Sequence, residues 1–434
     1  MHAQCRETGD IVPRYLQQAL SYPREIKLYL IYTLLVNLGI GVYVLIFNLY
    51  LERIGFRPDF IGLFNAVQTV AMGVVALGIG YLINRVGTWR CIAYGSVFFL
   101  ITSIGVALTG NAAAILALGA LNGAATAFVT VPTMPFIIEW TPAEARSSVA
   151  ALCFSLTSLS MMLGSLIGGW SPRLFSVLGG VAVDSTLAFR GTLIFGIALA
   201  ALGLPPMWLM RAAREPRSRF LGPTAALPPL TSSKRRQVRR DLVVFVAVGL
   251  CLSFGAGAVV PFYNVFLSSV GARPGEIGTI FSLASAVAAL VGLAAPLAAR
   301  KLGTLPAILL VRISPAPFFF LLALSPTVGL AAVAMSVRTS SANMGWPIDS
   351  TYIAEILPPE ARANAFSFRS GAWNLGYALA SFIAGEVIVS VGYVPTFVAF
   401  GVTIVVSTLG FVYYFRGRTP ANIAAEDRAG LAAV

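Results

Sequence analysis

Hydrophobic residues form long runs along most of the chain, and short polar segments separate them. Each run has about 20 residues or more, which is the length that an α-helix needs to cross a bilayer. We predict twelve such spans, at residues 28–51, 60–83, 91–109, 112–138, 147–170, 188–210, 242–267, 276–298, 304–325, 327–353, 363–390 and 393–415. Strands of a membrane barrel have only about 10 residues and alternate in polarity. The pattern therefore predicts an all-α membrane protein.

Two other segments depart from this pattern. Residues 11–21 place apolar side chains at helical spacing beside polar ones, as in a helix that lies at the membrane interface. Residues 211–240 carry nine Lys or Arg residues and several prolines, so they are too polar to span a membrane. We predict that they link an N-terminal bundle of six spans, residues 1–210, to a C-terminal bundle of six spans with a short tail, residues 241–434.

The two halves carry the same sequence features at one fixed offset. The segment Glu139-Trp-Thr-Pro142-Ala-Glu144-Ala145-Arg146 recurs 216 positions later as Glu355-Ile-Leu-Pro358-Pro-Glu360-Ala361-Arg362. The same offset pairs Gly39, Gly41, Asn48, Gly55, Pro58 and Gly62 with Gly255, Gly257, Asn264, Gly271, Pro274 and Gly278. No gap is needed, so the chain is expected to be a duplication whose halves are related by a pseudo-twofold axis along the membrane normal.

Composition supports a membrane protein and argues against an enzyme. Hydrophobic residues make up 57% of the chain and charged residues 11%, which is too little charge for the surface of a soluble globule. The one histidine is His2, so neither a His-based metal site nor Ser-His or Cys-His catalysis has suitable residues. The four cysteines are scattered along the chain. We expect no cofactor, no metal and no disulfide.

The positive charges are distributed unevenly between the two sides of the predicted spans. Of the 30 Lys and Arg residues, five lie in the loops on one side and three lie inside spans, which leaves 22 on the side of the termini and the linker. Loops rich in Lys and Arg stay in the cytoplasm. We therefore expect a multi-pass protein of the cell inner membrane with both termini cytoplasmic. The net charge of +13 is explained by topology and anionic lipid, so no nucleic-acid partner is expected.

The loop after the second span carries a motif of a known family. Gly80-Tyr-Leu82-Ile-Asn84-Arg85-Val-Gly87-Thr-Trp-Arg90 resembles the G-x-L-x-D-R-x-G-R-R/K motif of the major facilitator superfamily, with Asn84 in the place of the aspartate. Twelve spans in two halves with a basic central loop are also similar to that family, and this resemblance covers nearly the whole chain. It implies a secondary transporter that works by alternating access around a site near the membrane midplane.

The resemblance also implies a set of gating residues on the cytoplasmic side. They are Asn84, Arg85 and Arg90 after the second span, Glu139 and Arg146 in the repeated segment of the first half, and Glu355 and Arg362 in the second. An alternative for Arg85 and Arg90 is that they only fix the topology.

The fifth span carries a motif that bears on the direction of transport. Gly164-Ser165-Leu-Ile-Gly168-Gly169 resembles the G-P-x-x-G-G motif of the family's antiporters, which indicates export of a small organic solute. Packing of small residues between helices is the alternative. The arginine that these antiporters carry in span four has no counterpart here, so the coupling proton or ion stays open. Import or facilitated diffusion of a small, anionic solute is a second possibility. A membrane receptor or scaffold is a third, although the loops leave no room for a soluble signalling domain.

Charged residues in the interior of spans, away from their ends, occur only in the second half, at Arg312, Arg338, Asp349, Arg369 and Glu386. A charge at the centre of a bilayer costs about 2.5–3.5 kcal/mol, so such residues need a partner or a cavity. Arg338 lies near the middle of span ten, and we predict that it is the principal charged contact of the substrate. Asp349 and Arg369 are expected to form an ion pair that acts as a gating or structural bridge. Arg312 is expected to snorkel or to support packing.

Neutral polar residues complete the predicted substrate site. They are Asn37, Asn48, Asn122, Thr126, Asn264 and Asn343, with Trp373 and the adjacent Asn374 placed to contact a ring-bearing substrate. The alternative is that these residues hydrogen-bond or pack helices together. The expected partners are a small-molecule substrate, membrane lipids and a coupling proton or ion, and we expect a monomer.

Overall fold

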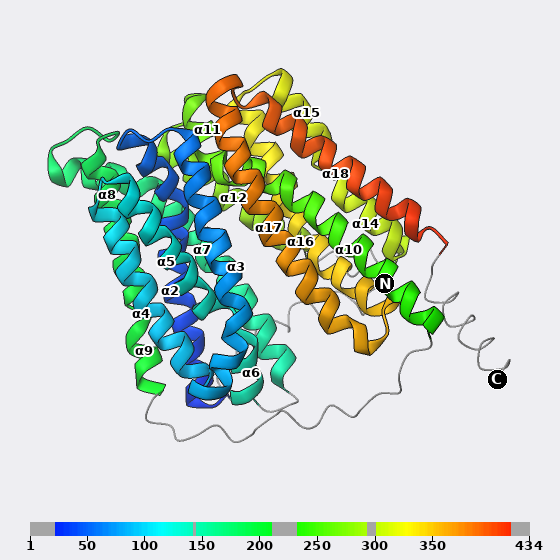
Figure 1. The fold of residues 1–434 in the computed structure, drawn as a ribbon. Coiled ribbons are helices and arrows are strands. Elements are labelled where there is room, and N and C mark those ends of the chain that lie inside the picture. The colour runs from blue at the N-terminus through cyan, green and yellow to red at the C-terminus, as the bar shows by residue number, and fades with distance from the viewer. Residues whose placement is uncertain (1–21, 142–144, 211–231, 293–300, 418–434) are drawn as a thin grey trace, which may run out of the picture.

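The computed structural model describes residues 22–141, 145–210, 232–292 and 301–417, and this part of the chain forms helices and no strand (Figure 1). Within it, 11 segments are long and apolar enough to cross a membrane. The helix Val328–Ile356 covers the remaining predicted span, residues 327–353, and is not one of these 11 segments. The predicted interfacial helix at residues 11–21 lies outside the described residues.

The helices of the first half are α2 (Arg24–Arg53), α3 (Pro58–Val86), α4 (Thr88–Leu108), α5 (Ala112–Thr130), α6 (Thr133–Trp140), α7 (Arg146–Gly179), α8 (Thr186–Ala201) and α9 (Leu204–Leu209). Those of the second half are α10 (Ser232–Val259), η3 (Val260–Phe262), α11 (Tyr263–Ser269), α12 (Pro274–Gly292), α14 (Thr304–Ile313), α15 (Ala316–Leu324), α16 (Val328–Ile356), α17 (Pro359–Val391) and α18 (Val394–Phe415). Figure 1 shows the two halves side by side, with the first in blue to green and the second in green to red.

Four predicted spans are broken into shorter helices, and a proline lies at or just after each break. Pro132 separates α5 from α6, Pro261 lies in η3 between α10 and α11, and Pro315 separates α14 from α15. Pro205 follows the fourth break, between α8 and α9. Proline lacks the N–H that the helical hydrogen-bond pattern requires, so a continuous helix is interrupted there. The linker also differs from the prediction, because α10 begins at Ser232 and its first turns include residues 232–240.

The duplication extends to the helix ends. Gly55 and Gly271 have φ of +97° and +93°, and Gly87 and Gly303 have φ of +90° and +85°. These left-handed conformations favour glycine, because it has no Cβ to clash with the backbone. The side chain of Asn111 caps α5 by accepting from the amide of Ala114. Thr327, which is 216 positions later, caps α16 in the same way. The predicted pair of related six-helix bundles is confirmed.

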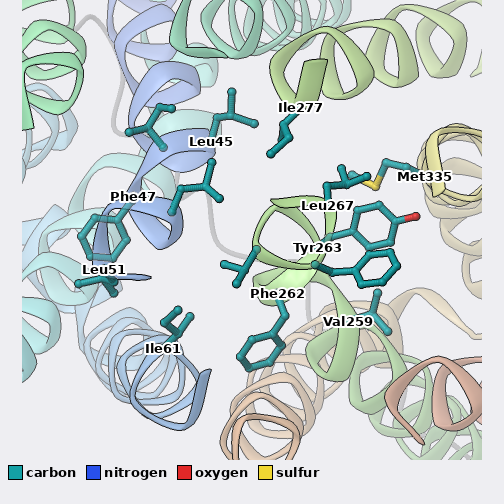
Figure 2. Close-up of a cluster of buried hydrophobic side chains, with 14 of the residues drawn as sticks. Leu45, Phe47, Leu51, Ile61, Val259, Phe262, Tyr263, Leu267, Ile277 and Met335 are labelled. Atoms are coloured by element: carbon teal, nitrogen blue, oxygen red, sulfur yellow. The ribbon is translucent and has the colours of Figure 1, made fainter. Parts of the chain in front are cut away.

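The apolar cores show how the halves meet. We call the side where α9 ends and α10 begins the linker face, and the side where α2 turns into α3 the opposite face. Towards the linker face each half has its own buried cluster, one around Tyr29 and Phe136 and the other around Phe245 and Tyr352. Towards the opposite face a single cluster includes side chains of both halves, and Figure 2 shows Leu45, Phe47, Leu51 and Ile61 with Phe262, Tyr263, Leu267 and Ile277. The halves are thus joined at the opposite face.

Candidate functional site

Two asparagines join the halves by equivalent hydrogen bonds. Asn48 Nδ2 on α2 donates to the carbonyl of Pro261 at 2.5 Å, and Asn264 Nδ2 on α11 donates to the carbonyl of Leu45 at 2.7 Å. Both asparagines are buried, and they are 216 positions apart. A buried amide that satisfies a backbone carbonyl of the other half stabilises the contact between halves. In this structure the side chains of both asparagines therefore hydrogen-bond to the protein backbone.

Close helix packing beside the asparagines follows the same symmetry. A methyl group at Gly278 on α12 would lie 2.6 Å from the carbonyl oxygen of Ser165 and 2.7 Å from Cα of Gly169, both on α7. A methyl group at Gly62 on α3 would clash with the carbonyl oxygen of Ser381 on α17. The small residues of the span-five motif therefore form a helix contact between the halves. This contact supports the packing alternative for that motif.

We expect Gly62→Ala to weaken the closure of the opposite face by about 1–3 kcal/mol, because the added methyl group overpacks the contact between α3 and α17. Spin labels on Arg57→Cys and Arg273→Cys, which are exposed in the turns of that face, would report the change as longer distances between the halves.

Gly78→Ala is the matched control, since Gly78 lies on the same helix and a methyl group there would meet nothing within 4 Å. Unchanged label distances in Gly62→Ala would contradict the assignment of Gly62 to the closure.

The predicted gating residues of the repeated segments make contacts within their own halves. Thr88 Oγ1 donates to Glu139, and Thr304 Oγ1 donates to Glu355 at 3.3 Å. The arginines of the same two segments, Arg146 and Arg362, donate from Nε to the backbone carbonyls of Thr141 and Leu357, at 3.3 and 2.9 Å. Each contact in the first half thus recurs in the second half at the offset of 216 residues. These contacts order the ends of α6, α7, α16 and α17 at the linker face.

The remaining gating residues of the first half lie near the turn between α3 and α4. The guanidinium of Arg85 lies 4.7 Å from the centre of the Tyr81 ring, and Arg90 donates to the carbonyl of Val86 at 3.4 Å. Both arginines are exposed, and Asn84 lies in the last turn of α3 with its side chain outside the described part of the structure. Their gating role stays a prediction.

The second half contains a buried cluster of three charges. Asp349 Oδ2 on α16 lies 2.9 Å from Arg369 on α17, which confirms the predicted ion pair. It also lies 2.6 Å from Arg312 on α14. The expectation that Arg312 would snorkel is wrong, because its side chain is buried and makes the shorter of the two contacts. A carboxylate between two guanidinium groups makes the cost of burial lower for all three.

Aromatic rings and a small cavity surround this charge cluster. Arg312 lies over Phe411 at 4.8 Å and Arg369 over Trp346 at 4.7 Å. Arg312 Nη1 and Asp349 Oδ1 are buried without a hydrogen-bond partner. The adjoining cavity has a volume of about 10 Å³, which suffices for about one water molecule. The cluster therefore nearly fills the interior of the second half at this level.

The first half contains a much larger cavity of about 300 Å³. We call it the N-half cavity. Its wall consists of Tyr29, Tyr32, Thr33, Val36, Asn37, Ile40, Ser96, Phe99, Leu100, Thr126, Val129, Thr130, Thr133, Met134, Ile137, Cys153, Phe154, Thr157 and Ala200. Two residues of the predicted substrate site, Asn37 and Thr126, belong to this wall. A volume of this size with a mainly apolar wall and a few polar groups is typical of small-molecule sites.

Arg338 lies on α16, half-buried, outside this cavity. Tyr263 and Tyr377 are titratable side chains near its guanidinium. The structure gives it no ion pair or hydrogen bond with any of the described residues. A guanidinium inside a membrane span has five N–H donors to satisfy. Arg338 is thus free to bind a further acceptor, and its role in substrate binding stays a prediction.

The other predicted substrate residues lie in several different environments. Asn122 is fully buried and donates to Thr102 at 3.0 Å and to Ser103 at 2.9 Å, so it holds α4 and α5 together. Asn343 is exposed on α16, and Asn374 lies on α17 opposite Gly73 of α3. Trp373 lines the small cavity of the second half. None of these four residues belongs to the wall of the N-half cavity, which Asn37 and Thr126 line.

The sequence analysis missed most of the wall of the N-half cavity. A signal for it exists in the first span, where Tyr29, Tyr32, Thr33, Val36, Asn37 and Ile40 follow one another at intervals of three, one, three, one and three residues. That spacing places all six on one face of a helix. A face of hydroxyl and aromatic residues in a membrane span indicates a solvated or ligand-binding surface, because lipid-facing positions favour aliphatic side chains.

Comparisons with known proteins agree with this architecture. The sequence profile of the Major Facilitator Superfamily matches residues 29–348 and 339–432. A search of curated protein sequences finds no match.

Among solved structures, the nucleoside transporter NupG superimposes with a TM-score of 0.71 at 14% identity, over 91% of this chain and 100% of that one. A D-xylose-proton symporter superimposes with a TM-score of 0.67 at 16% identity, over 91% of this chain and 97% of that one. At these identities the structures establish the fold alone. The profile covers most of the chain, and we conclude that the protein belongs to the Major Facilitator Superfamily of secondary transporters, which work by alternating access.

Proposed function

We propose that this transporter exports a small organic solute. The outward direction is suggested by the span-five motif Gly164-Ser165-Leu-Ile-Gly168-Gly169, and the way the halves meet supports alternating access: they share one core at the opposite face and have separate cores towards the linker face. A solute would enter from the linker face, bind between the joined ends and the linker face, and leave when the halves rock. The contacts of Asn48, Asn264, Gly62 and Gly278 would break in that step.

The proposed substrate site combines residues of both halves. Asn37 and Thr126 contribute from the wall of the N-half cavity, and Arg338 contributes a cation from α16. The gating role belongs to the residues at the linker face, Glu139, Arg146, Glu355 and Arg362 with Asn84, Arg85 and Arg90. The buried pair of Asp349 and Arg369 keeps α16 and α17 together during the movement.

Transport by purified protein in lipid vesicles tests this function. We expect a labelled solute to move against its gradient when a pH or sodium gradient is imposed, and to stop when the gradient is collapsed. The same experiment identifies the coupling ion. The monomer predicted from the sequence would be checked on the detergent-purified protein by light scattering. A protein that binds solutes without moving any of them under either gradient would support the receptor alternative.

The linker face is proposed to lie in the cytoplasm of a cell whose inner membrane holds the protein. The support is the excess of Lys and Arg on that side, which includes the exposed Arg235, Arg236, Arg239 and Arg240 of α10. We expect Ser232→Cys to react with an impermeant thiol reagent only after the cells are opened. Labelling of that cysteine from outside intact cells would reverse the proposed topology, and with it the direction of export.

A further inference from the structure

The cavities of the two halves are equivalent. At the offset of 216 residues, eight of the nine residues that line the small cavity of the second half have a counterpart in the wall of the N-half cavity. Tyr29, Tyr32, Thr33, Val36, Ser96, Thr133, Cys153 and Thr157 correspond to Phe245, Val248, Gly249, Leu252, Arg312, Asp349, Arg369 and Trp373. Equivalent positions of the two bundles therefore line two cavities that differ in their residues.

Side-chain size explains why one interior is open and the other is filled. In the second half, two arginines, an aspartate and Trp373 occupy the space and leave about 10 Å³. In the first half, the four corresponding residues are Ser96, Thr133, Cys153 and Thr157, and about 300 Å³ stays open. The second half demonstrates that side chains can fill the bundle at this position. The open space in the first half is thus a property of its residues, and such a cavity inside a transporter indicates a ligand.

The wall of the N-half cavity presents hydrogen-bond acceptors. The hydroxyl groups of Thr33, Ser96, Thr126, Thr130 and Thr133 each donate to the carbonyl four residues earlier in the chain, at 2.8 to 3.0 Å. Since the proton of Ser96 is used in this way, Tyr32 donates to Ser96 Oγ at 2.7 Å. The protons of these six hydroxyl groups are used within the protein, and their oxygen lone pairs remain available to a ligand that carries N–H or O–H groups.

Among the described residues of the chain, those that line this wall include no Lys, Arg, Asp or Glu. A charged group that entered would lose its hydration without meeting an opposite charge, and an anion would face the lone pairs of the hydroxyl oxygens. The rings of Tyr29, Phe99 and Phe154 offer apolar area of the kind that a flat ring contacts well. The wall therefore favours an uncharged, ring-bearing group with hydrogen-bond donors.

We propose that the N-half cavity binds the uncharged, ring-bearing part of the transported solute through hydrogen-bond donors on that solute. That the bound solute is also transported rests on the proposed function, whereas the selectivity of the cavity can be measured without transport. Arg338 lies outside this wall and is left to bind a polar acceptor elsewhere on the same solute.

Three probes with one ring and one chain length, which differ in charge, test the selectivity. They are 4-hydroxyphenylethanol, which is uncharged, 4-hydroxyphenylacetate, an anion, and tyramine, a cation. Cys153 is a free thiol in the cavity wall, so its reaction with methyl methanethiosulfonate reports occupancy in protein where Cys5, Cys91 and Cys251 are replaced by Ser. We expect the uncharged probe to slow the reaction about tenfold at ten times its dissociation constant, and the charged probes to have a smaller effect at equal concentration.

Two substitutions on α7 connect this protection to the cavity. Thr157→Trp copies Trp373 of the second half and would fill the space, so the ratio of rates with and without the uncharged probe should fall to about one. Leu159→Trp adds the same ring at an exposed position of the same helix and should leave the ratio unchanged. Since the second half accommodates Trp373, the Thr157→Trp protein is expected to fold, and its melting temperature checks this.

Several results would overturn the inference. They are equal protection by all three probes, stronger protection by either charged probe, protection by none of them, or full protection in a folded Thr157→Trp protein. These outcomes are separate from the proposed function, which is tested by gradient-driven movement in vesicles. Selective protection of Cys153 without movement would support the site and contradict the transport, and movement without selective protection would do the reverse.

Discussion

Asp349→Thr should destabilise the folded protein by about 3–5 kcal/mol, because it leaves Arg312 and Arg369 buried without their shared carboxylate. The two guanidinium groups would then repel each other in a region that excludes water. We expect a lower melting temperature in detergent and earlier unfolding in sodium dodecyl sulfate.

The first half supplies the control for this experiment. The triple variant Arg312→Ser, Asp349→Thr and Arg369→Cys installs the residues that the N-half cavity carries at the same positions, Ser96, Thr133 and Cys153. It removes all three charges together, so no charge is left unpaired. We expect this triple variant to be more stable than Asp349→Thr alone, although it removes more side-chain atoms. A triple variant less stable than the single one would mean that packing volume, and not charge pairing, is what the cluster provides.

The fold could be predicted from the sequence because lipid imposes simple rules on it. Long apolar runs give the spans, and the offset of 216 residues gives the symmetry, which reappears in the structure at Gly55 and Gly271 and at Asn48 and Asn264. These features depend on local sequence or on a repeat, and both can be read directly. The break at Pro132 was missed, since a proline in a membrane helix can be tolerated or can end the helix according to its neighbours.

The candidate site was harder to predict, because the role of a polar residue in a span depends on which way its helix is rotated. Asn37 and Asn122 are both asparagines in apolar runs. Asn37 lines the N-half cavity, whereas Asn122 is fully buried between helices. Arg312 was expected to snorkel or to support packing, and its partner Asp349 could not be identified without the packing of α14 against α16. The offset of 216 residues pairs Arg312 with Ser96 in the sequence alone. The difference between these two residues can be interpreted only when the structure shows that they line equivalent cavities.

Arg338→Gln should reduce transport strongly, by about 10- to 150-fold, if Arg338 binds an acceptor group of the solute. A hydrogen bond to a charged group is worth about 1.5–3 kcal/mol, and each 1.4 kcal/mol is a factor of ten. Arg338 persists in a membrane span against a cost of about 2.5–3.5 kcal/mol, and Tyr263 and Tyr377 are titratable side chains near it. Initial rates in vesicles, corrected for the amount of folded protein, measure the effect.

Arg338→Lys separates a directed contact from a general effect of charge. Lysine keeps the positive charge but loses the planar fork that binds two oxygens at once. A bidentate contact should therefore weaken almost as much in Arg338→Lys as in Arg338→Gln, whereas a field effect should survive in the lysine variant. Arg312 cannot take over the role, since it is buried against Asp349. Transport that stays intact in both variants would remove Arg338 from the substrate site and leave the N-half cavity as the remaining candidate for binding the solute.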